Sequence, residues 1–341
     1  MLLTAIFIAV VGGGGWYYMF IQMPMQSRIE AQEDALARLS GLMTPVSNSL
    51  DPAYTDANGD LVADAPTDPA KCVDPPVLHF SYNYAEDQSG YKAAFADFMK
   101  YLSKATGKPV EYADITSVAD QLSQLKHNQL DVTSFNTGNV PIAVCAAGFV
   151  PVASLGSDKG GSKIATEIIA RTDSGIAIIP DLKGHELALT DPSSNSGYKA
   201  PLVLIKSEFG LYPGKDFGVR YSGGHEESIK GLADGTYQVI AVASDVLNRE
   251  IAAGVINPNQ FKVIYTSESF PTAAFGYAYN LKPDLADKIR QAILDFKFSG
   301  TSMEKFFAGT GQDRLVGVNY KDDWALIRSI DNQIGFAYKV K

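Results

Sequence analysis

The segment TDPSSNSGYKAP at residues 190–201 concentrates small hydrogen-bonding side chains in one turn. Its Ser-Ser-Asn-Ser-Gly run at 193–197 stands between an apolar run and an apolar helical stretch. Serine and asparagine are favoured N-cap residues, so one interpretation is a well-capped helix. The alternative is an anion site, because free backbone N–H groups and hydroxyls at a helix start attract phosphate-like groups.

The proline that follows this turn helps to decide between a capped helix and an anion site. Proline has no N–H and suits the first helical position, so the sequence predicts a regular helix from near Pro201 and an irregular loop before it. The amides of Asn195, Ser196 and Gly197 can then point outward, and Gly197 lets the backbone approach a ligand closely. The hydroxyls of Ser194 and Ser196 add donors. Such neutral donors suit a tetrahedral oxyanion.

Polar residues also follow the other predicted strands, which is where ligands bind in open α/β sheets. The candidate binding residues in these segments are Tyr82, Tyr84, Asn136, Thr137, His225 and Asp245. His225 begins a predicted helix and can donate to an anion in its protonated or neutral form. Asp245 either caps the next helix or accepts from a cationic group on the ligand. Because these strand ends converge on one cleft, we favour the anion site over the capped helix.

The same residues also raise the question of an enzyme. Ser194 or Ser196 with His225 and Asp245 supplies the residue types of a hydrolase triad. However, the GxSxG nucleophile elbow is absent, and the order Ser–His–Asp differs from that of α/β-hydrolases. A serine hydrolase is therefore the remote alternative to a binding protein.

The composition argues against several other functional classes of protein. The 341 residues carry a net charge of −9, which argues against a broad nucleic-acid surface. The four histidines and two cysteines show no metal-ligand spacing, so we expect neither a metal site nor a cofactor. Cys72 and Cys145 are either one disulfide of an exported protein or two buried thiols. We expect a monomer.

The N-terminus carries no charged residue from Leu2 through Met25, which is long enough to span a bilayer as a helix. It lacks a basic n-region and an AxA-type cleavage site, so we interpret 1–25 as an uncleaved anchor; a processed signal peptide is the alternative. A short amphipathic helix at 27–42 and a Pro- and Asp-rich spacer at 44–76 follow.

The spacer contains DANGDLVAD, which places Asp56, Asn58, Asp60 and Asp64 at a spacing similar to that of a calcium loop. Leu61 stands where such a loop has glycine, and no glutamate occupies the twelfth position. We therefore favour a solvated acidic linker over a calcium site.

From residue 77 onward, predicted strands alternate with predicted helices, which implies open, parallel α/β sheets. Two consecutive units of this kind predict a bilobed protein with a cleft between its lobes. The predicted divisions are 1–25 (anchor), 26–76 (short helix and spacer), 77–170 (first part of lobe 1), 171–262 (lobe 2) and 263–341 (return to lobe 1 and C-terminal helices).

With these residues in view, the chain resembles the phosphate/phosphite/phosphonate-binding family of ABC-transporter substrate-binding proteins. The stretches that carry the resemblance are RTDSGI, DLKG, DPSSNSGYKAP, SGGHEESIKGLADG and FP at 270–271. The resemblance implies a type II periplasmic-binding fold, two lobes joined by two crossing strands. It also implies that Ser194, Asn195 and Ser196 hold the phosphoryl oxygens near His225, and that Asp245 meets an amine of the ligand.

Two positions depart from the family pattern. Phe135 stands where an aromatic hydroxyl is usual, and Asn195 where threonine is frequent. The resemblance predicts an extracytoplasmic receptor that delivers a phosphonate, phosphite, phosphate or similar oxyanion to an ABC permease. The uncharged N-terminal segment, which lies outside the resemblance, predicts that this receptor is tethered at the periplasmic face of the inner membrane. The alternative is a sensor subunit that signals to a membrane kinase.

Overall fold

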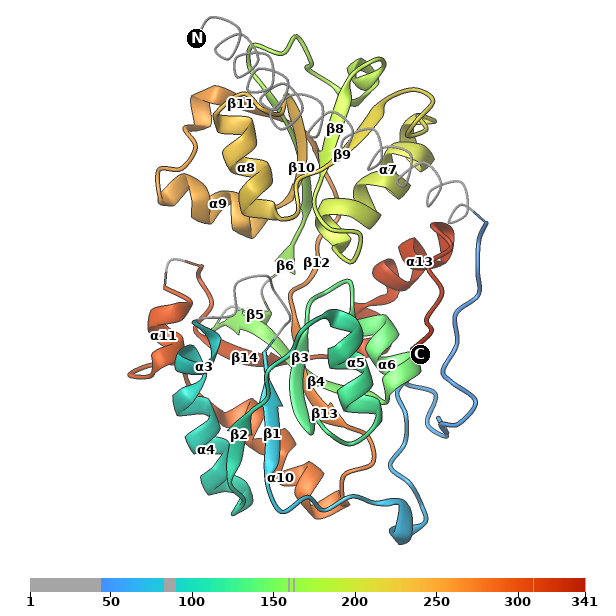
Figure 1. Cartoon of the computed structure of the whole chain (residues 1–341), viewed down its shortest axis with the longest axis vertical. Coiled ribbons are helices and arrows are strands. Elements are labelled where there is room, and N and C mark those ends of the chain that lie inside the picture. Colours follow the sequence, from blue (N-terminus) through green and yellow to red (C-terminus); the bar gives the residue numbers. More distant parts are fainter. Residues whose placement is uncertain (1–43, 83–89, 159, 162, 309, 341) are drawn as a thin grey trace, which may run out of the picture.

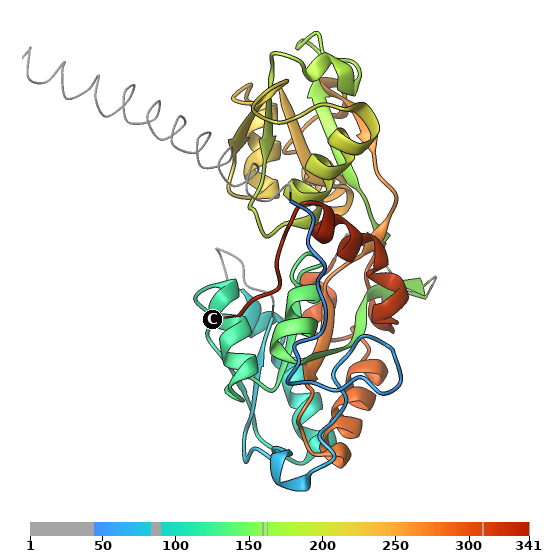
Figure 2. The same ribbon diagram turned by 90° about the vertical axis from the view of Figure 1, so that its right-hand side faces the viewer.

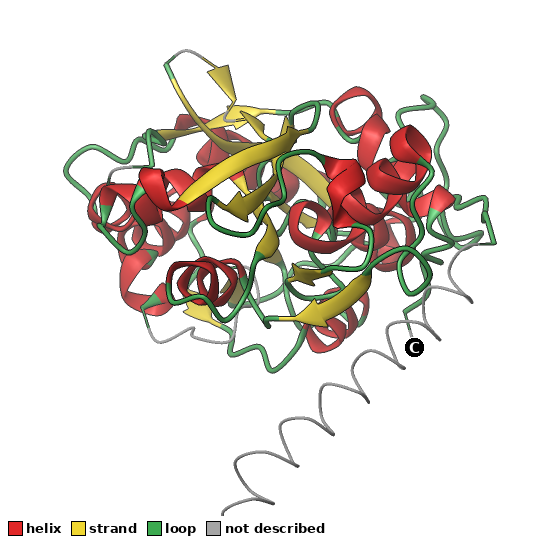
Figure 3. Ribbon diagram, turned by 90° about the horizontal axis from the view of Figure 1, so that it is seen from above, coloured by secondary structure: helices red, strands yellow, loops and turns green. Residues whose placement is uncertain are grey.

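The computed structural model describes residues 44–82, 90–158, 160–161, 163–308 and 310–340. They form two α/β lobes, one above the other in Figure 1, each built around its own sheet. Seen along the long axis, helices flank the strands on both sides (Figure 3). The predicted two-lobed α/β architecture is therefore confirmed.

Lobe 1 contains a seven-stranded sheet in the order β14-β4-β13-β3-β1-β2, with β5 paired to β4. Its strands are β1 (Leu78–Ser81), β2 (Val110–Tyr112), β3 (Val132–Phe135), β4 (Phe149–Ser157), β5 (Gly160–Gly161), β13 (Ala274–Ala278) and β14 (Arg314–Gly317). Its helices are η2 (Pro69–Lys71), α3 (Tyr91–Ala94), α4 (Ala96–Thr106), α5 (Val118–Lys126), α6 (Val140–Ala147), α10 (Pro283–Asp295) and α11 (Ser302–Phe306). In α4, Phe98 and Leu102 form the buried face, and Gly107 ends the helix with φ 74°.

Lobe 2 contains a five-stranded sheet in the order β11-β7-β10-β8-β9. Its strands are β7 (Thr166–Arg171), β8 (Glu186–Leu189), β9 (Gly218–Tyr221), β10 (Val239–Ala243) and β11 (Phe261–Thr266). Its helices are η3 (Ile179–Leu182), η4 (Asn195–Lys199), α7 (Ala200–Phe209), α8 (His225–Ala233), α9 (Ser244–Ala252) and η5 (Pro258–Gln260).

Both sheets are mixed, so the prediction of parallel sheets was wrong in part. Strands β1, β2 and β3 are parallel, as are β8, β9 and β10. Strands β4 and β13 in lobe 1, and β7 and β11 in lobe 2, pair antiparallel with their neighbours. These four strands lead into or out of the crossings between lobes. In lobe 1 the returning strand β13 runs opposite to β3 and β4, and in lobe 2 the entering strand β7 runs opposite to β10 and β11.

Two short strands join the lobes. The chain enters lobe 2 through β6 (Lys163–Ile164) and returns through β12 (Phe270–Pro271), and these two strands pair antiparallel. Figure 1 shows them between the lobes. This hinge permits the lobes to move relative to one another, as hinged two-domain binding proteins do.

The C-terminal helix α13 (Ala325–Gln333), which follows α12 (Tyr320–Asp323), spans the junction (Figure 2). Ile327 belongs to the apolar core of lobe 1, whereas Ile330 and Ile334 belong to a core cluster of lobe 2. The helix therefore contacts both lobes in addition to the two hinge strands.

The segment 44–76, predicted as a spacer, runs along lobe 1 beside the C-terminal tail (Figure 2). The Asn48 side-chain amide donates to the Phe336 carbonyl at 2.8 Å, and its oxygen accepts from the Tyr338 N–H at 3.0 Å. Both ends of the described chain are thus tied together on one side of the molecule.

The acidic turn in this segment directs its carboxylates to its own backbone. The Asp56 carboxylate accepts from the amides of Asp60 and Leu61 at 3.0 and 3.1 Å, and Leu61 has φ 68°. Among the residues described, no three His, Cys, Asp or Glu side chains are placed to hold a metal ion.

The predicted anchor at 1–25 and the predicted helix at 27–42 lie outside the described residues. Within the described part of the chain, no helix combines the length and apolar character that a bilayer crossing needs.

Both cysteines are free thiols, so the disulfide alternative was wrong. Cys145 lies in the wholly buried helix α6, where burial raises the pKa of its thiol to about 11. Cys72 is half-buried next to η2, and its sulfur approaches the Pro66 carbonyl at 3.6 Å.

Candidate functional site

The turn after β8 is helical rather than irregular. Residues Asn195–Lys199 form one π-helical turn that leads directly into α7, and the α-helix starts at Ala200, close to the predicted position. Pro201 has no N–H to donate to the Gly197 carbonyl, which instead accepts from the Thr190 N–H at 3.0 Å. The Ser194 hydroxyl caps the turn by accepting from the Gly197 N–H at 3.1 Å.

Gly197 is required by packing and not by a positive φ. It is not among the residues with positive φ, and an added Cβ would lie 2.1 Å from Thr190 Oγ1 and 2.8 Å from Thr190 Cβ. The glycine therefore permits the close approach of η4 to the end of β8, and its contact with a ligand stays a prediction.

His225 meets the two serines of this turn. Its Nε2 lies 3.3 Å from Ser194 Oγ and 3.5 Å from Ser196 Oγ. Its Nδ1 accepts from the Ala243 N–H at 3.2 Å, so the neutral ring carries its proton on Nε2, facing the hydroxyls. Burial, with a smaller effect from the Arg249 charge, lowers the pKa of His225 to about 4.

Asn195 lies between these serines and is only 2% exposed. Neither its side-chain oxygen nor its side-chain nitrogen has a hydrogen-bond partner among the described residues. An amide buried without partners is costly, since each unpaired group forfeits about 1–3 kcal/mol. A bound group that accepts and donates hydrogen bonds would remove this cost.

Asp245 of lobe 2 and Tyr82 of lobe 1 are polar groups that lie near each other where the lobes meet. Asp245 lies in the first turn of α9, and its Oδ1 is buried without a partner within the described chain. Burial raises the pKa of its carboxyl, while the Val246 N–H and the Arg249 charge act in the other direction. The pKa of Tyr82 is raised well above its usual value, first by burial and then by neighbouring groups that include Asp245.

The segment after β3 contributes structural contacts. Phe135 is 1% exposed and packs edge-on against Phe149 at 5.0 Å, so the structure places it in the core of lobe 1 and not at the site. Asn136 Oδ1 accepts from the Asn139 N–H at 3.0 Å, and Thr137 Oγ1 donates to the Pro271 carbonyl at 2.8 Å. Tyr84 lies outside the described residues.

The next residue of this segment, Gly138, touches the opposite lobe. A Cβ added there would lie 2.6 Å from the Ser193 carbonyl oxygen and 2.9 Å from the Asn195 amide nitrogen. Ala243 of lobe 2 also packs into the core cluster of lobe 1. The two lobes are therefore closed over the site.

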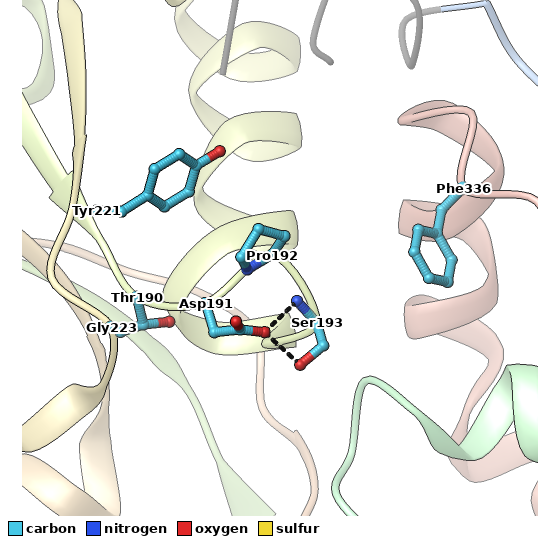
Figure 4. A pocket seen from close by; sticks show the side chains of 7 residues that line it. All are labelled: Thr190, Asp191, Pro192, Ser193, Tyr221, Gly223 and Phe336. Carbon is cyan, nitrogen blue, oxygen red and sulfur yellow. Dashed lines mark hydrogen bonds between the residues drawn. The ribbon is translucent and has the colours of Figure 1, made fainter. Parts of the chain in front are cut away.

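A pocket of about 510 Å³ opens on lobe 2 next to this contact, lined by Thr190, Asp191, Pro192, Ser193, Tyr221, Gly223 and Phe336. Figure 4 shows Phe336 facing Pro192 and Ser193 across it. The Asp191 carboxylate accepts from the amide and the hydroxyl of Ser193 at 2.8 and 2.5 Å. The pocket shares only Ser193 with the 193–197 turn, so it is distinct from the buried site at Asn195 and His225.

The structure therefore brings together Ser194, Asn195, Ser196 and His225. Asp245 and Tyr82 interact with each other across the junction of the lobes. Sequence reasoning missed Gly138 and Arg249. Arg249 lies one helical turn after Asp245, a spacing that places both side chains on one helix face. No local pattern marks Gly138, because its contacts lie in the other lobe.

Comparison with known proteins identifies this architecture. The model of the family described as "ABC transporter, phosphonate, periplasmic substrate-binding protein" matches residues 80–324, well over half of the chain. The chain belongs to this family. It is a periplasmic substrate-binding protein of an ABC transporter of the phosphonate class, as the sequence resemblance predicted.

Individual relatives agree with this assignment. The phosphate-import protein PhnD of Mycolicibacterium smegmatis is 26% identical over 216 residues, which cover 60% of this chain and 67% of that protein. The fold matches PhnD1 from Prochlorococcus marinus in complex with methylphosphonate, with a TM-score of 0.64 and 15% identity over 76% of this chain and 99% of that one. It also matches a binding-protein component of an ABC phosphonate transporter from Pseudomonas aeruginosa, with a TM-score of 0.62 and 21% identity over 76% and 86% of the two chains.

These solved relatives have the two-lobed periplasmic-binding fold, and the structure of this chain has the same fold with mixed sheets. Family membership also places the chain outside the cytoplasm as a partner of an ABC transporter.

Proposed function

We propose that this chain captures an oxyanion of the phosphonate, phosphite or phosphate class at the 193–197 turn and delivers it to its ABC permease. The observation that carries this proposal is the Asn195 side chain, 2% exposed and without a partner at either polar atom among the described residues. It lies between two hydroxyls that both approach His225 Nε2. A phosphoryl group supplies the acceptors that this set of donors lacks.

The site binds its anion through neutral donors. His225 is neutral near pH 7 because burial lowers its pKa to about 4, and it presents Nε2–H. The nearby Lys199 turns away to Asp331 and the Gly138 carbonyl. Neutral hydrogen bonds hold an anion while avoiding the desolvation of a second charge.

Asp245 determines which members of the class bind best. Its buried Oδ1 has no donor within the described chain, so the ligand must supply one. The amine of an aminophosphonate and the remaining O–H of a singly protonated phosphonate or phosphate both supply such a donor. Comparison of the affinities for 2-aminoethylphosphonate and methylphosphonate separates the amine donor from the O–H donor.

The geometry at His225 favours binding over hydrolysis. A serine nucleophile needs an unprotonated Nε2 and an Nδ1–H held by a carboxylate. Here Nδ1 accepts from the Ala243 N–H, so Nε2 carries the proton of the neutral ring and cannot take one from Ser194. We therefore assign the Ser194–His225 contact to ligand binding.

We also propose that residues 1–25 tether the protein at the periplasmic face of the inner membrane, and that it acts there as a monomer. Leu2 through Met25 carry no charge and are long enough to span a bilayer. Carbonate extraction of membranes should leave the protein in the pellet, and light scattering in detergent should give one chain per particle. A protein released by carbonate would contradict the tether.

The ligand is identified by a thermal-shift and calorimetric screen of phosphate, phosphite, methylphosphonate, 2-aminoethylphosphonate and sulfate. A ligand at 100 times its Kd adds about 2.7 kcal/mol of stability. We expect at least one phosphorus oxyanion to raise the melting temperature and sulfate to have little effect. A flat response to all phosphorus oxyanions would reject the proposed site.

A further inference from the structure

Lys199, two residues after the anion-binding turn, is a fully buried charge that ligand binding does not use. Its Nζ donates to Asp331 Oδ1 at 2.9 Å and to the Gly138 carbonyl at 2.8 Å. The Lys199 and Asp331 side chains are both 0% exposed. The Phe336 ring lies 3.9 Å from the same Nζ, and the Tyr338 hydroxyl donates to Asp331 Oδ2 at 2.7 Å.

A buried ion pair of this kind is a poor source of stability. Removing two charges from water costs several kcal/mol per ion, and apolar residues of similar size often serve the fold equally well. The ion pair and its hydrogen bonds do fix the positions of the groups that form them, because each donor must lie within hydrogen-bonding distance of its acceptor. The places of these groups in the fold indicate which parts of the molecule the network holds together.

The network joins three parts of the molecule. Lys199 ends η4 in lobe 2, Gly138 follows β3 in lobe 1, and Asp331 lies on α13, which packs into both lobes. Movement about the hinge separates the loop that contains Gly138 from the turn at Ser193, which it touches here. The bond from Lys199 to the Gly138 carbonyl can therefore exist only while the lobes are closed.

We propose that Lys199 is a positioning residue that latches the closed form. Braced by Asp331, it holds the lobe 1 loop against the anion-binding turn and so slows ligand release. This inference rests on the proposed function. A bond made only after closure changes the dissociation rate and leaves the association rate nearly constant.

The test compares three forms of the full chain: wild type, Lys199→Met with Asp331→Leu, and Lys230→Met. The double variant removes both buried charges together, so neither is left without its partner. Lys230 is an exposed lysine of lobe 2 on α8 and serves as the matched control. Equilibrium dialysis with radiolabelled phosphate and methylphosphonate gives Kd, and a chase with unlabelled ligand gives the release rate.

We expect the double variant to melt cooperatively near the wild-type temperature and to release ligand about 10-fold faster or more, since a hydrogen bond from a charged donor is lost. Its association rate should stay within about 3-fold of wild type, and the control should match wild type in both rates. If the double variant releases ligand at the wild-type rate, the latch is overturned while the proposed function stays intact. If wild type binds none of phosphate, phosphite, methylphosphonate and 2-aminoethylphosphonate, the proposed function fails and the latch fails with it.

Lys199→Met alone is the second variant, in case the double variant does not fold. Asp331 can then take up a proton, because burial already raises the pKa of its carboxyl, and Tyr338 still donates to it. The same acceleration of release is expected. If both variants fail to melt cooperatively, Lys199 has a purely structural role and the proposal is overturned.

Discussion

Ser194 and Ser196 both lie within reach of His225, but their surroundings differ. Ser194 Oγ also accepts from the Gly197 N–H and so caps the helix that begins at Asn195. Ser196 makes no such capping bond with the described part of the chain and is 5% exposed. At the scale of single residues, Ser194 therefore stabilises the helix in addition to its proposed role in binding, whereas Ser196 has only the proposed binding role.

Ser196→Ala is expected to weaken oxyanion binding with little change in the melting temperature of the ligand-free protein. Loss of a hydrogen bond to a charged ligand costs about 1.5–3 kcal/mol, or roughly 10- to 150-fold in affinity. Ser194→Ala should show the same loss and also destabilise the ligand-free protein by about 1 kcal/mol, because a cap is removed. Calorimetric titration and thermal melts measure both effects. Unchanged affinity in both variants would show that these serines only cap the helix.

His225 should make the stability of the ligand-free protein depend on pH. Its pKa is lowered from 6.5 to about 4 by burial, so the unfolded chain takes up the proton first as the pH falls. The neutral ring therefore stabilises the fold above about pH 6.5, and this contribution is lost as the pH falls toward 4. Between pH 7.5 and 4.5 the loss amounts to about 2–3 kcal/mol.

Denaturant titrations of wild type and His225→Gln at these two pH values measure this contribution. Carboxylates titrate in both proteins, so their effect cancels in the comparison. The variant should lose less stability on acidification than wild type. Equal losses would mean that His225 is not held neutral by its surroundings.

At the scale of elements, the site depends on how closely η4 approaches the end of β8. A Cβ at residue 197 would overlap the Thr190 side chain, with 2.1 Å to its Oγ1. Thr190 is 1% exposed and has no room to move away. The glycine therefore maintains the contact between helix and strand that sets the position of the Ser-Asn-Ser run.

Gly197→Ala is expected to destabilise the ligand-free protein by about 1–3 kcal/mol through overpacking. Adding Thr190→Gly should restore part of this loss, because the three atoms nearest to the new methyl group all belong to the Thr190 side chain. Urea unfolding of the two variants and of Thr190→Gly alone gives the coupling energy. Additive effects in this cycle would contradict the packing explanation.

The contact between Gly138 and the 193–195 segment is a second element-level feature, and it exists only between closed lobes. Gly138→Ala places a methyl carbon 2.6 Å from the Ser193 carbonyl oxygen in the closed form. We expect roughly 10-fold or greater loss of affinity, equivalent to about 1.4 kcal/mol, with an unchanged melting temperature for the ligand-free protein. Gly90→Ala is the control, because a Cβ there meets no atom within 4 Å. Wild-type affinity in Gly138→Ala would show that the lobes bind ligand without closing this far.

At the scale of the whole molecule, the two ends of the described chain are joined. Asn48 holds the C-terminal tail through Phe336 and Tyr338, and that tail continues from α13 at the junction of the lobes. The segment 44–51 is therefore part of the folded body and not merely a connection to the predicted anchor.

Removal of residues 1–43 is expected to leave Kd within about 2-fold, because the contacts described for the 193–197 turn and His225 are all made by residues outside this segment. Removal of residues 1–50 takes away the hydrogen bonds of Asn48, each worth about 0.5–1.5 kcal/mol, and should lower the melting temperature by a few degrees. Thermal melts and calorimetry of the two truncated proteins test this. Identical melting curves would mean that 44–50 adds nothing to the fold.

Local order along the chain made much of this protein predictable. The Ser-Asn-Ser run is close in space because it is close in sequence. Helix α10 forms where Leu285, Ile289 and Ile293 recur at helical spacing and bury one face. Secondary structure was harder to predict in the apolar run at 141–153. This run contains most of α6 and the start of β4, and short apolar runs do not distinguish helix from strand.

Tertiary structure alone decided the remaining features, because they depend on which segments meet. Ser194 and His225 are 31 residues apart, and Lys199 and Asp331 are 132 apart, so no local pattern pairs them. Phe135 could face the cleft or the core with equal ease in a strand, and packing against Phe149 determined its side. The sequence by itself determined the donor chemistry of the site and the family; the closure of two lobes determined which buried groups contact one another.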